Sequence, residues 1–207
     1  MEQSQRSRLR AGDQTAFGEL FDEQAQAIHQ YALRALGERT AAEDVVSLTF
    51  LEAWRLRAGL HEEGGSVRPW LFGIAANVLR NTRRAARRHQ AALGRLPAGE
   101  VVPDFAEELA GRLDDGAQLA AAHRALARLR RGEREVFLLC VWSGLAYADA
   151  AEALGIPVGT VRSRLSRART RLRRLADEET KREPRLIRGQ VPGGRTEAAR
   201  SIQEKAR

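Results

Sequence analysis

The sequence has a single cysteine, Cys140, so the chain cannot form an intramolecular disulfide bond and suits a reducing cytoplasm. Cys140 lies in the apolar run VFLLCVW, where we expect a buried structural thiol rather than a reactive one. No apolar run is long enough to span a bilayer, and we do not expect the polar stretch MEQSQRSRLRAGDQ to be a signal peptide. These absences argue against a secreted, disulfide-stabilised or membrane-spanning protein.

The residue groups typical of enzymes are also missing. The histidines are scattered, and His61 in HEEGG lacks the second histidine of a zinc-binding helix. There is no glycine loop for phosphate and no Gly-x-Ser-x-Gly turn, and the paired acids at 62–63 and 114–115 fall in expected loops, where solvation explains them. We therefore expect no enzyme activity, no catalytic residues, no metal and no cofactor.

What the chain has in excess is positive charge, with a net charge of +8. The ranges 68–88 and 156–175 contain arginines and no acids, whereas acids dominate 98–118. Solubility alone does not require this separation, but binding to a polyanion such as nucleic acid favours it. We therefore expect two basic surfaces, one near each end of the folded part.

The first half of the chain has helical spacing. Apolar residues recur every three or four positions from Phe17 to Leu36, and Gly37 suits the end of that helix. Thr40 and Glu43 in TAAE predict a capping box at the start of the next helix.

The helix after TAAE has two apolar sides. Val46, Phe50, Ala53 and Trp54 form one of them, and Leu48 and Leu51 point the other way. Either the helix is enclosed within its own domain, or the outward leucines form the apolar centre of a partner surface.

A loop over 58–67 precedes a helix that begins at Pro69. Its predicted inward stripe is Leu71, Ile74, Ala75, Val78 and Thr82. The opposite side has Asn77, Arg80, Arg84 and Arg87, with Asn81 and Arg88 at its edge and Trp70 at its start. Arginines neutralise phosphates, amides bond base edges, and an exposed indole offers a stacking surface. This pattern predicts nucleic-acid binding; the alternative is a solvated helix face with its tryptophan in the core.

The composition of 89–118 predicts a flexible acidic linker, with a root-mean-square span of roughly 30 Å. Helical spacing resumes at Leu119, and we predict four helices: one closed by Leu126 and Leu129, one over 133–142, one in YADAAEALG and one from Val158. Two short helices joined by a glycine turn are typical of a helix-turn-helix.

The last helix has one apolar stripe and one basic side. The stripe is Val161, Leu165, Ala168, Leu172 and Leu175; the opposite side has Ser163, Ser166, Arg167 and Thr170, flanked by Arg162, Arg173 and Arg174. Small hydroxyl residues permit close approach to DNA, and the arginines reach guanine edges or phosphates. A membrane-surface helix would need bulky apolar residues on this side, and it has none.

We therefore predict an all-α fold of two small helical domains joined by a flexible linker, the second a four-helix domain with a helix-turn-helix. The predicted boundaries are 10–88, 89–118 and 119–175, followed by a disordered tail over 176–207.

Three segments together resemble the extracytoplasmic-function (ECF) sigma factors of bacterial RNA polymerase. These are AEDVVSLTFLEAW, RPWLFGIAANVLRN and GLAYADAAEALGIPVGTVRSRLSRARTRLRR. The resemblance covers about Gly12 to Arg88 and Ala120 to Leu175, in the family's order.

The resemblance implies roles for both domains. The first would bind the polymerase clamp, melt the minus-ten promoter element and capture the non-template strand. Its loop from Leu60 to Val67 is similar to the loop that holds a flipped base in a pocket. The second would read the minus-thirty-five element in the major groove, while the linker passes near the RNA exit path. The implied clamp residues are Asp44, Val45, Leu48, Thr49, Leu51 and Glu52; the strand residues are Asn77, Arg80, Asn81 and Arg84, beside Trp70; the duplex residues are Arg162, Ser163, Ser166 and Arg167.

The implied partners are core RNA polymerase, promoter DNA as duplex and as melted strand, and an anti-sigma factor from which an environmental signal releases the chain. A monomer is expected in the bacterial cytoplasm, at the nucleoid when in holoenzyme, with no membrane contact of its own. Ser47 and Leu48 stand where many relatives have Gln and an acid, which predicts a more apolar clamp contact. An ordinary helix-turn-helix repressor or activator is the alternative, but the chain shows no clear heptad helix for the dimer it would need.

Overall fold

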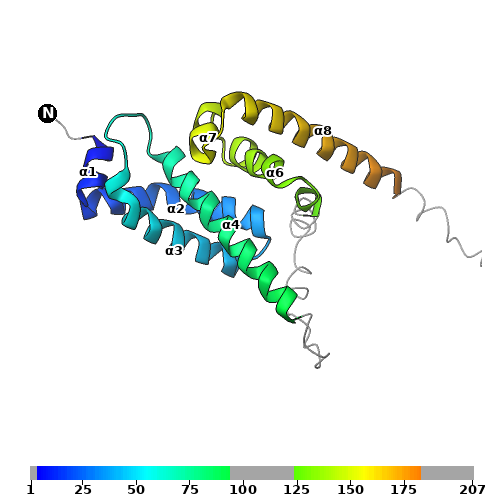
Figure 1. The fold of residues 1–207 in the computed structure, drawn as a ribbon, viewed down its shortest axis with the longest axis horizontal. Helices are drawn as coiled ribbons and strands as arrows, with labels where there is room; N and C mark the ends of the chain where they lie inside the picture. Colours follow the sequence, from blue (N-terminus) through cyan, green and yellow to red (C-terminus); the bar gives the residue numbers. More distant parts are fainter. Residues whose placement is uncertain (1–3, 94–123, 183–207) are drawn as a thin grey trace, which may run out of the picture. The chain divides into compact units, whose positions relative to one another are not determined.

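A computed structural model of the chain describes residues 4–93 and 124–182, and every regular element in these ranges is helical (Figure 1). The first half contains α1 (Gln5–Ala11), α2 (Gln14–Leu36), α3 (Arg39–Leu56), a short 3-10 turn (Arg57–Gly59) and α4 (Arg68–Leu93). The second half contains α6 (Arg131–Phe137), which continues as a π-helix (Leu138–Trp142), then α7 (Tyr147–Leu154) and α8 (Val158–Arg182). The described residues up to Leu172 form one compact unit, and a second unit begins at Arg173.

The core of the first half lies between α2, α3 and α4, which pack side by side. Ile28 and Tyr31 of α2, Val45 of α3, and Leu71 and Phe72 of α4 are fully buried in it. In the second half, Val136 of α6 and Val161, Leu165 and Ala168 of α8 are buried, as the predicted stripe of the last helix requires.

The helix α4 is enclosed on more sides than its predicted stripe. Phe72, Ala76 and Leu79 are also buried, because α4 packs against α2 and α7 as well as α3, with the Phe72 ring centroid 5.6 Å from that of Tyr31 in α2. The contact with α7 is close at Gly73, where an added Cβ would lie 2.8 Å from the carbonyl oxygen of Ala153.

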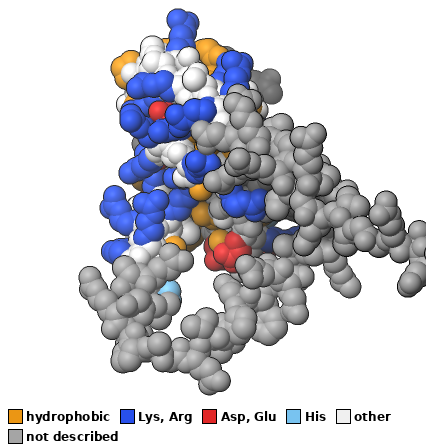
Figure 2. Space-filling model, turned by 90° about the vertical axis from the view of Figure 1, so that its right-hand side faces the viewer, with side chains coloured by type: hydrophobic (Ala, Val, Ile, Leu, Met, Phe, Trp, Pro, Cys, Tyr) orange, Lys and Arg blue, Asp and Glu red, His pale blue; other side chains and the backbone are white. Residues whose placement is uncertain are grey.

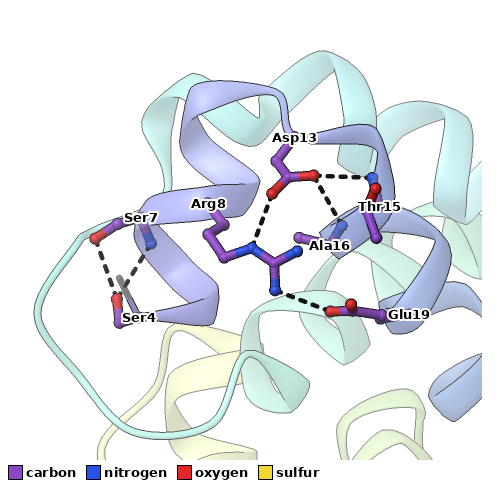
Figure 3. Close-up of polar contacts among 7 residues, drawn as sticks. All are labelled: Ser4, Ser7, Arg8, Asp13, Thr15, Ala16 and Glu19. Atoms are coloured by element: carbon purple, nitrogen blue, oxygen red, sulfur yellow. Dashed lines mark hydrogen bonds and ion pairs between the residues drawn. The ribbon is translucent and has the colours of Figure 1, made fainter. Parts of the chain in front are cut away.

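A polar network fixes α1 against the start of α2 (Figure 3). The Asp13 carboxylate caps α2 by accepting hydrogen bonds from the backbone N–H groups of Thr15 (2.9 Å) and Ala16 (3.1 Å). Arg8 of α1 donates to Asp13 at 2.8 Å and to Glu19 of α2 at 3.1 Å. The hydrogen bonds from Arg8 and from Ala16 lower the pKa of Asp13, so the carboxylate stays charged at neutral pH.

The predicted capping box at Thr40 is wrong. Gly37 ends α2 with a φ of 80°, and the chain re-enters a helix at once, so α3 begins at Arg39, before Thr40 could cap it. Glu43 instead forms an i,i+4 ion pair with Arg39 at 3.0 Å.

Two predicted boundaries also change. Residues 89–93 of the predicted linker belong to α4, and residues 176–182 of the predicted disordered tail belong to α8. Both helices continue because their sequences contain no glycine or proline at these points. The remaining residues of the predicted linker, 94–118, and of the tail, 183–207, lie outside the described ranges.

Candidate nucleic-acid and partner interfaces

The outer side of α8 is a solvent-exposed polar surface. Arg162, Ser163, Ser166 and Arg167 are all exposed, opposite the buried Val161. Arg167 donates to the Ser163 carbonyl at 3.1 Å and to the Ser163 hydroxyl at 3.2 Å, which holds the guanidinium along the helix surface. The helix therefore presents hydroxyls and guanidinium groups together, with its apolar side committed to the core.

A buried glutamate fixes α8 to α6. Glu133 is 5% exposed, and its carboxylate accepts a hydrogen bond from Arg171 of α8 at 3.3 Å and from the backbone N–H of Arg130 at 3.2 Å. Gly155, with a φ of 62°, ends α7 and allows the tight turn into α8. These contacts set the direction of α8 relative to the rest of its helix-turn-helix.

The polar side of α4 is open to solvent for most of its residues. Asn77, Asn81 and Arg84 are exposed, whereas Arg80 is half-buried, donates to the Asn77 side chain and lies 4.0 Å from the Glu135 carboxylate. Trp70 does not stand free as predicted: it is half-buried and packs against the core, because the start of α4 is enclosed. Only part of its indole is available for stacking.

Arginines from two helices line a cleft of about 430 Å³ beside this polar side, and Glu135 is the acidic residue in its lining. They are Arg80, Arg83, Arg84, Arg87 and Arg88 of α4, and Arg131 and Arg134 of α6. Burial lowers the pKa of Arg83 to about 10, and the Arg134 charge adds to this effect. Sequence reasoning missed Arg131 and Arg134, since only folding brings α6 near α4. Basic side chains also dominate the described surface in the view of Figure 2, so the potential of this face is suited to a polyanion.

The outward leucines of α3 line an apolar groove of about 590 Å³ between α3 and α4. Leu48 is 47% exposed, Leu51 67% and Leu56 42%, so the helix is not enclosed in its own domain. Ile74 and Val78 of α4 complete the apolar lining. The groove has the apolar centre expected of a partner surface.

Polar residues surround this groove, including Glu52, which pairs with Arg55 at 2.6 Å. Ser47 donates back to the Glu43 carbonyl at 3.2 Å, so its hydroxyl is satisfied within the helix. Leu56 was missed by sequence reasoning, although its i+8 spacing from Leu48 could have indicated it.

Two residues of the implied clamp set lie in the core. Val45 and Thr49 are both 0% exposed, and the Thr49 hydroxyl donates to the Val45 carbonyl at 2.6 Å. They cannot touch a partner in this structure, because their side chains are fully enclosed in the core. Asp44, Leu48, Leu51 and Glu52 remain at least partly accessible.

Over the described ranges, no group of three or more His, Cys, Asp or Glu side chains could hold a metal ion. No helix in the same ranges is both long and apolar enough to cross a bilayer. Cys140 is half-buried rather than buried, and burial raises the pKa of its thiol, which keeps it protonated at neutral pH.

Both halves of the chain match known protein families. The family profile described as Sigma-70 region 2 matches residues 20–89, and the profile described as Sigma-70, region 4 matches residues 119–172. The ECF RNA polymerase sigma factor SigL of Mycobacterium tuberculosis is 36% identical over 154 residues, covering 74% of this chain and 85% of SigL. The RNA polymerase sigma factor CnrH of Cupriavidus metallidurans is 32% identical over 180 residues, covering 82% and 91%.

Solved structures show the same similarity. CnrH in complex with the cytosolic domain of CnrY has a TM-score of 0.64 at 29% identity, covering 84% of this chain and 96% of that one. The sigma factor RpoE of Bartonella quintana, in complex with the anti-sigma factor NepR, has a TM-score of 0.58 at 29% identity, covering 78% and 96%. Because both sigma-70 regions match in order and relatives above 30% identity align over most of their length, the chain belongs to the ECF family of RNA polymerase sigma factors.

Proposed function

We propose that this ECF sigma factor gives core RNA polymerase its promoter recognition and DNA melting, with no chemistry of its own. In this proposal, residues 10–88 act as region 2 and residues 119–175 as region 4, joined by the linker 89–118. The observation that supports it best is a pair of separate polar helix sides. The polar side of α4 has amides and arginines, and the polar side of α8 has hydroxyls and arginines. The opposite side of each helix lies in the core.

The outer side of α8 is proposed to read the minus-thirty-five element as duplex DNA. Ser163 and Ser166 leave room for the helix to enter the major groove, and Arg162 and Arg167 are long enough to reach base edges or phosphates. The exposure of all four side chains supports this role.

The polar side of α4 is proposed to hold the melted minus-ten strand. Asn77, Asn81 and Arg84 are accessible to a strand. Arg80 becomes accessible when its side chain moves away from the Glu135 carboxylate. Trp70 contributes a partly covered ring rather than a free one. The loop over 60–67 is proposed to receive a base flipped out of the duplex.

The groove between α3 and α4 is proposed as the contact with the polymerase clamp. Asp44, Leu48, Leu51 and Glu52 would touch the partner, and the buried Val45 and Thr49 would hold α3 in place. Solved relatives were captured with an anti-sigma factor or, for CnrH, with the cytosolic domain of CnrY. We propose that this chain is likewise restrained by an anti-sigma factor, and that an environmental signal releases the chain from it. It would act as a monomer in the bacterial cytoplasm, and at the nucleoid when in holoenzyme.

Transcription with purified components tests this function. The full chain is added to core polymerase and a library of randomised promoters, and the transcripts are sequenced. We expect transcripts that start downstream of two shared sequence elements, and core polymerase alone as the control should give none. No promoter-dependent transcript from any sequence would refute the proposal, and dimeric binding to duplex DNA without core polymerase would favour a repressor instead.

A further inference from the structure

Arg6 of α1 is a buried arginine that contacts the backbone of a distant loop. Its side chain is 8% exposed, although arginine is rarely buried without partners. Nε donates to the Gly65 carbonyl at 2.8 Å, Nη1 to the His61 carbonyl at 3.2 Å, and Nη2 to the Ser66 carbonyl at 2.9 Å. One guanidinium thus fixes three carbonyl groups of the same loop.

The loop over 60–67 has few other constraints on its shape. Leu60 and Val67 are each 2% exposed and anchor its two ends, whereas the six residues between them are exposed. Gly64 has a φ of 135°, a conformation that favours glycine, and an added Cβ there would lie 3.1 Å from Cζ of Arg6. The loop backbone therefore wraps closely around the guanidinium.

The helix that presents Arg6 is itself held rigidly. Leu9 of α1 is 1% exposed in the core, and the Arg8, Asp13 and Glu19 network ties α1 to α2 (Figure 3). Arg6 is therefore presented by a fixed support. This support precedes the residues that match region 2, which begin at 20.

We propose that Arg6 is a positioning residue for promoter melting, which holds the loop over 60–67 in the shape that receives the flipped base. This inference rests on the proposed function of that loop. A loop that is already ordered loses less conformational entropy when it binds a base, so the captured state is favoured. Lysine cannot replace Arg6, because its single ammonium lacks the planar fork that reaches three carbonyls at once.

Base capture is measured with the full chain in holoenzyme. A promoter has 2-aminopurine at one non-template minus-ten position at a time, and its fluorescence rises when that base leaves the stack. The variants are Arg6→Ala and Arg6→Lys. The matched control is Arg10→Ala, because Arg10 lies on the same helix and pairs with Glu62 of the same loop at 3.3 Å, but from an exposed position.

We expect base capture by both Arg6 variants to weaken by about tenfold or more, the effect of losing one or more charge-assisted hydrogen bonds. Arg10→Ala should capture the base as the wild type does. Binding of holoenzyme to a duplex that has only the minus-thirty-five element should stay within about twofold for all variants. Arg6 also lies 3.9 Å from Glu152 of α7, but the Glu152 side chain is 56% exposed, and such ion pairs contribute little. A purely structural role for Arg6 would instead weaken both readouts together.

A pair of neighbouring glycines gives a second test in which Arg6 itself is not substituted. Gly64→Ala should reproduce the loss of base capture, because its Cβ would crowd Cζ of Arg6 at 3.1 Å and alanine is strained at a φ of 135°. Gly65→Ala should not, because no atom lies within 4 Å of a Cβ added there. Thermal unfolding of each variant checks that it folds. If Arg6→Ala does not fold, base capture by Arg6→Lys and Gly64→Ala tests whether Arg6 positions the loop.

The outcomes separate this inference from the proposed function. If the wild type captures a base and the Arg6 and Gly64 variants match their controls, Arg6 is not a positioning residue, while the function of the loop stands. If the wild type unstacks no minus-ten base while it still transcribes, the role of the loop is wrong, and the inference about Arg6 is wrong with it.

Discussion

Replacing Leu51 with alanine should weaken polymerase binding without weakening the fold. Complete burial of a leucine side chain stabilises a complex by about 1.5–3 kcal/mol relative to exposure. Leu51 is 67% exposed in the free chain, so a covering partner could gain about 1–2 kcal/mol, or about 5- to 30-fold in Kd. The free energy of unfolding should change by less than about 0.5 kcal/mol, as for other exposed positions.

Val45→Ala provides the opposite control on the same helix. Val45 is 0% exposed, so its truncation should lower the free energy of unfolding by about 1.5–3 kcal/mol. The exposed leucines of the groove remain in this variant, so the contact proposed for polymerase is kept. Fluorescence anisotropy of labelled full-length chain titrated with core polymerase gives Kd, and urea unfolding gives stability. If Leu51→Ala bound as tightly as the wild type, or lost as much stability as Val45→Ala, the groove would not be the polymerase contact.

Three further changes test other parts of the structure. Arg167→Ala should cost about 1–3 kcal/mol in holoenzyme binding and relax preference at one minus-thirty-five position, measured by selection from randomised promoters; unchanged preference would mean that Arg167 reads no base. Glu133→Ala should lower the free energy of unfolding by about 2–3 kcal/mol in urea, because it leaves Arg171, which is one-third exposed, without its carboxylate partner; a loss under about 0.5 kcal/mol would show that this pair does not hold α8 to α6. The pKa of Asp13 is lowered in the folded chain, so its charge stabilises the fold above the ordinary aspartate pKa, and this contribution disappears as the pH falls through the lowered value. The Tm of Asp13→Asn should therefore lie below that of the wild type at neutral pH and converge with it in acid, whereas a constant difference across this range would contradict the assignment.

The sequence by itself determined the helical character of the chain, the stripe that docks α8 and the polar sides of α4 and α8. These features follow from local spacing, because residues three or four apart share one side of a helix wherever that helix lies. The exposure of Leu48 and Leu51 was only half determined: periodicity showed that they point away from the other apolar side, but not whether another helix covers them.

Only the tertiary structure decided which neighbours each side meets. Val45 and Thr49 are enclosed in the core, Trp70 is half-buried because the start of α4 is enclosed, and Arg131 and Arg134 join the α4 arginines in one cleft. Arg6 shows the difference most clearly, since its three carbonyl partners lie 55 to 60 residues away. Contacts at such separations depend on how whole helices pack, and that packing depends on the shape and burial of many side chains at once, which no local pattern records.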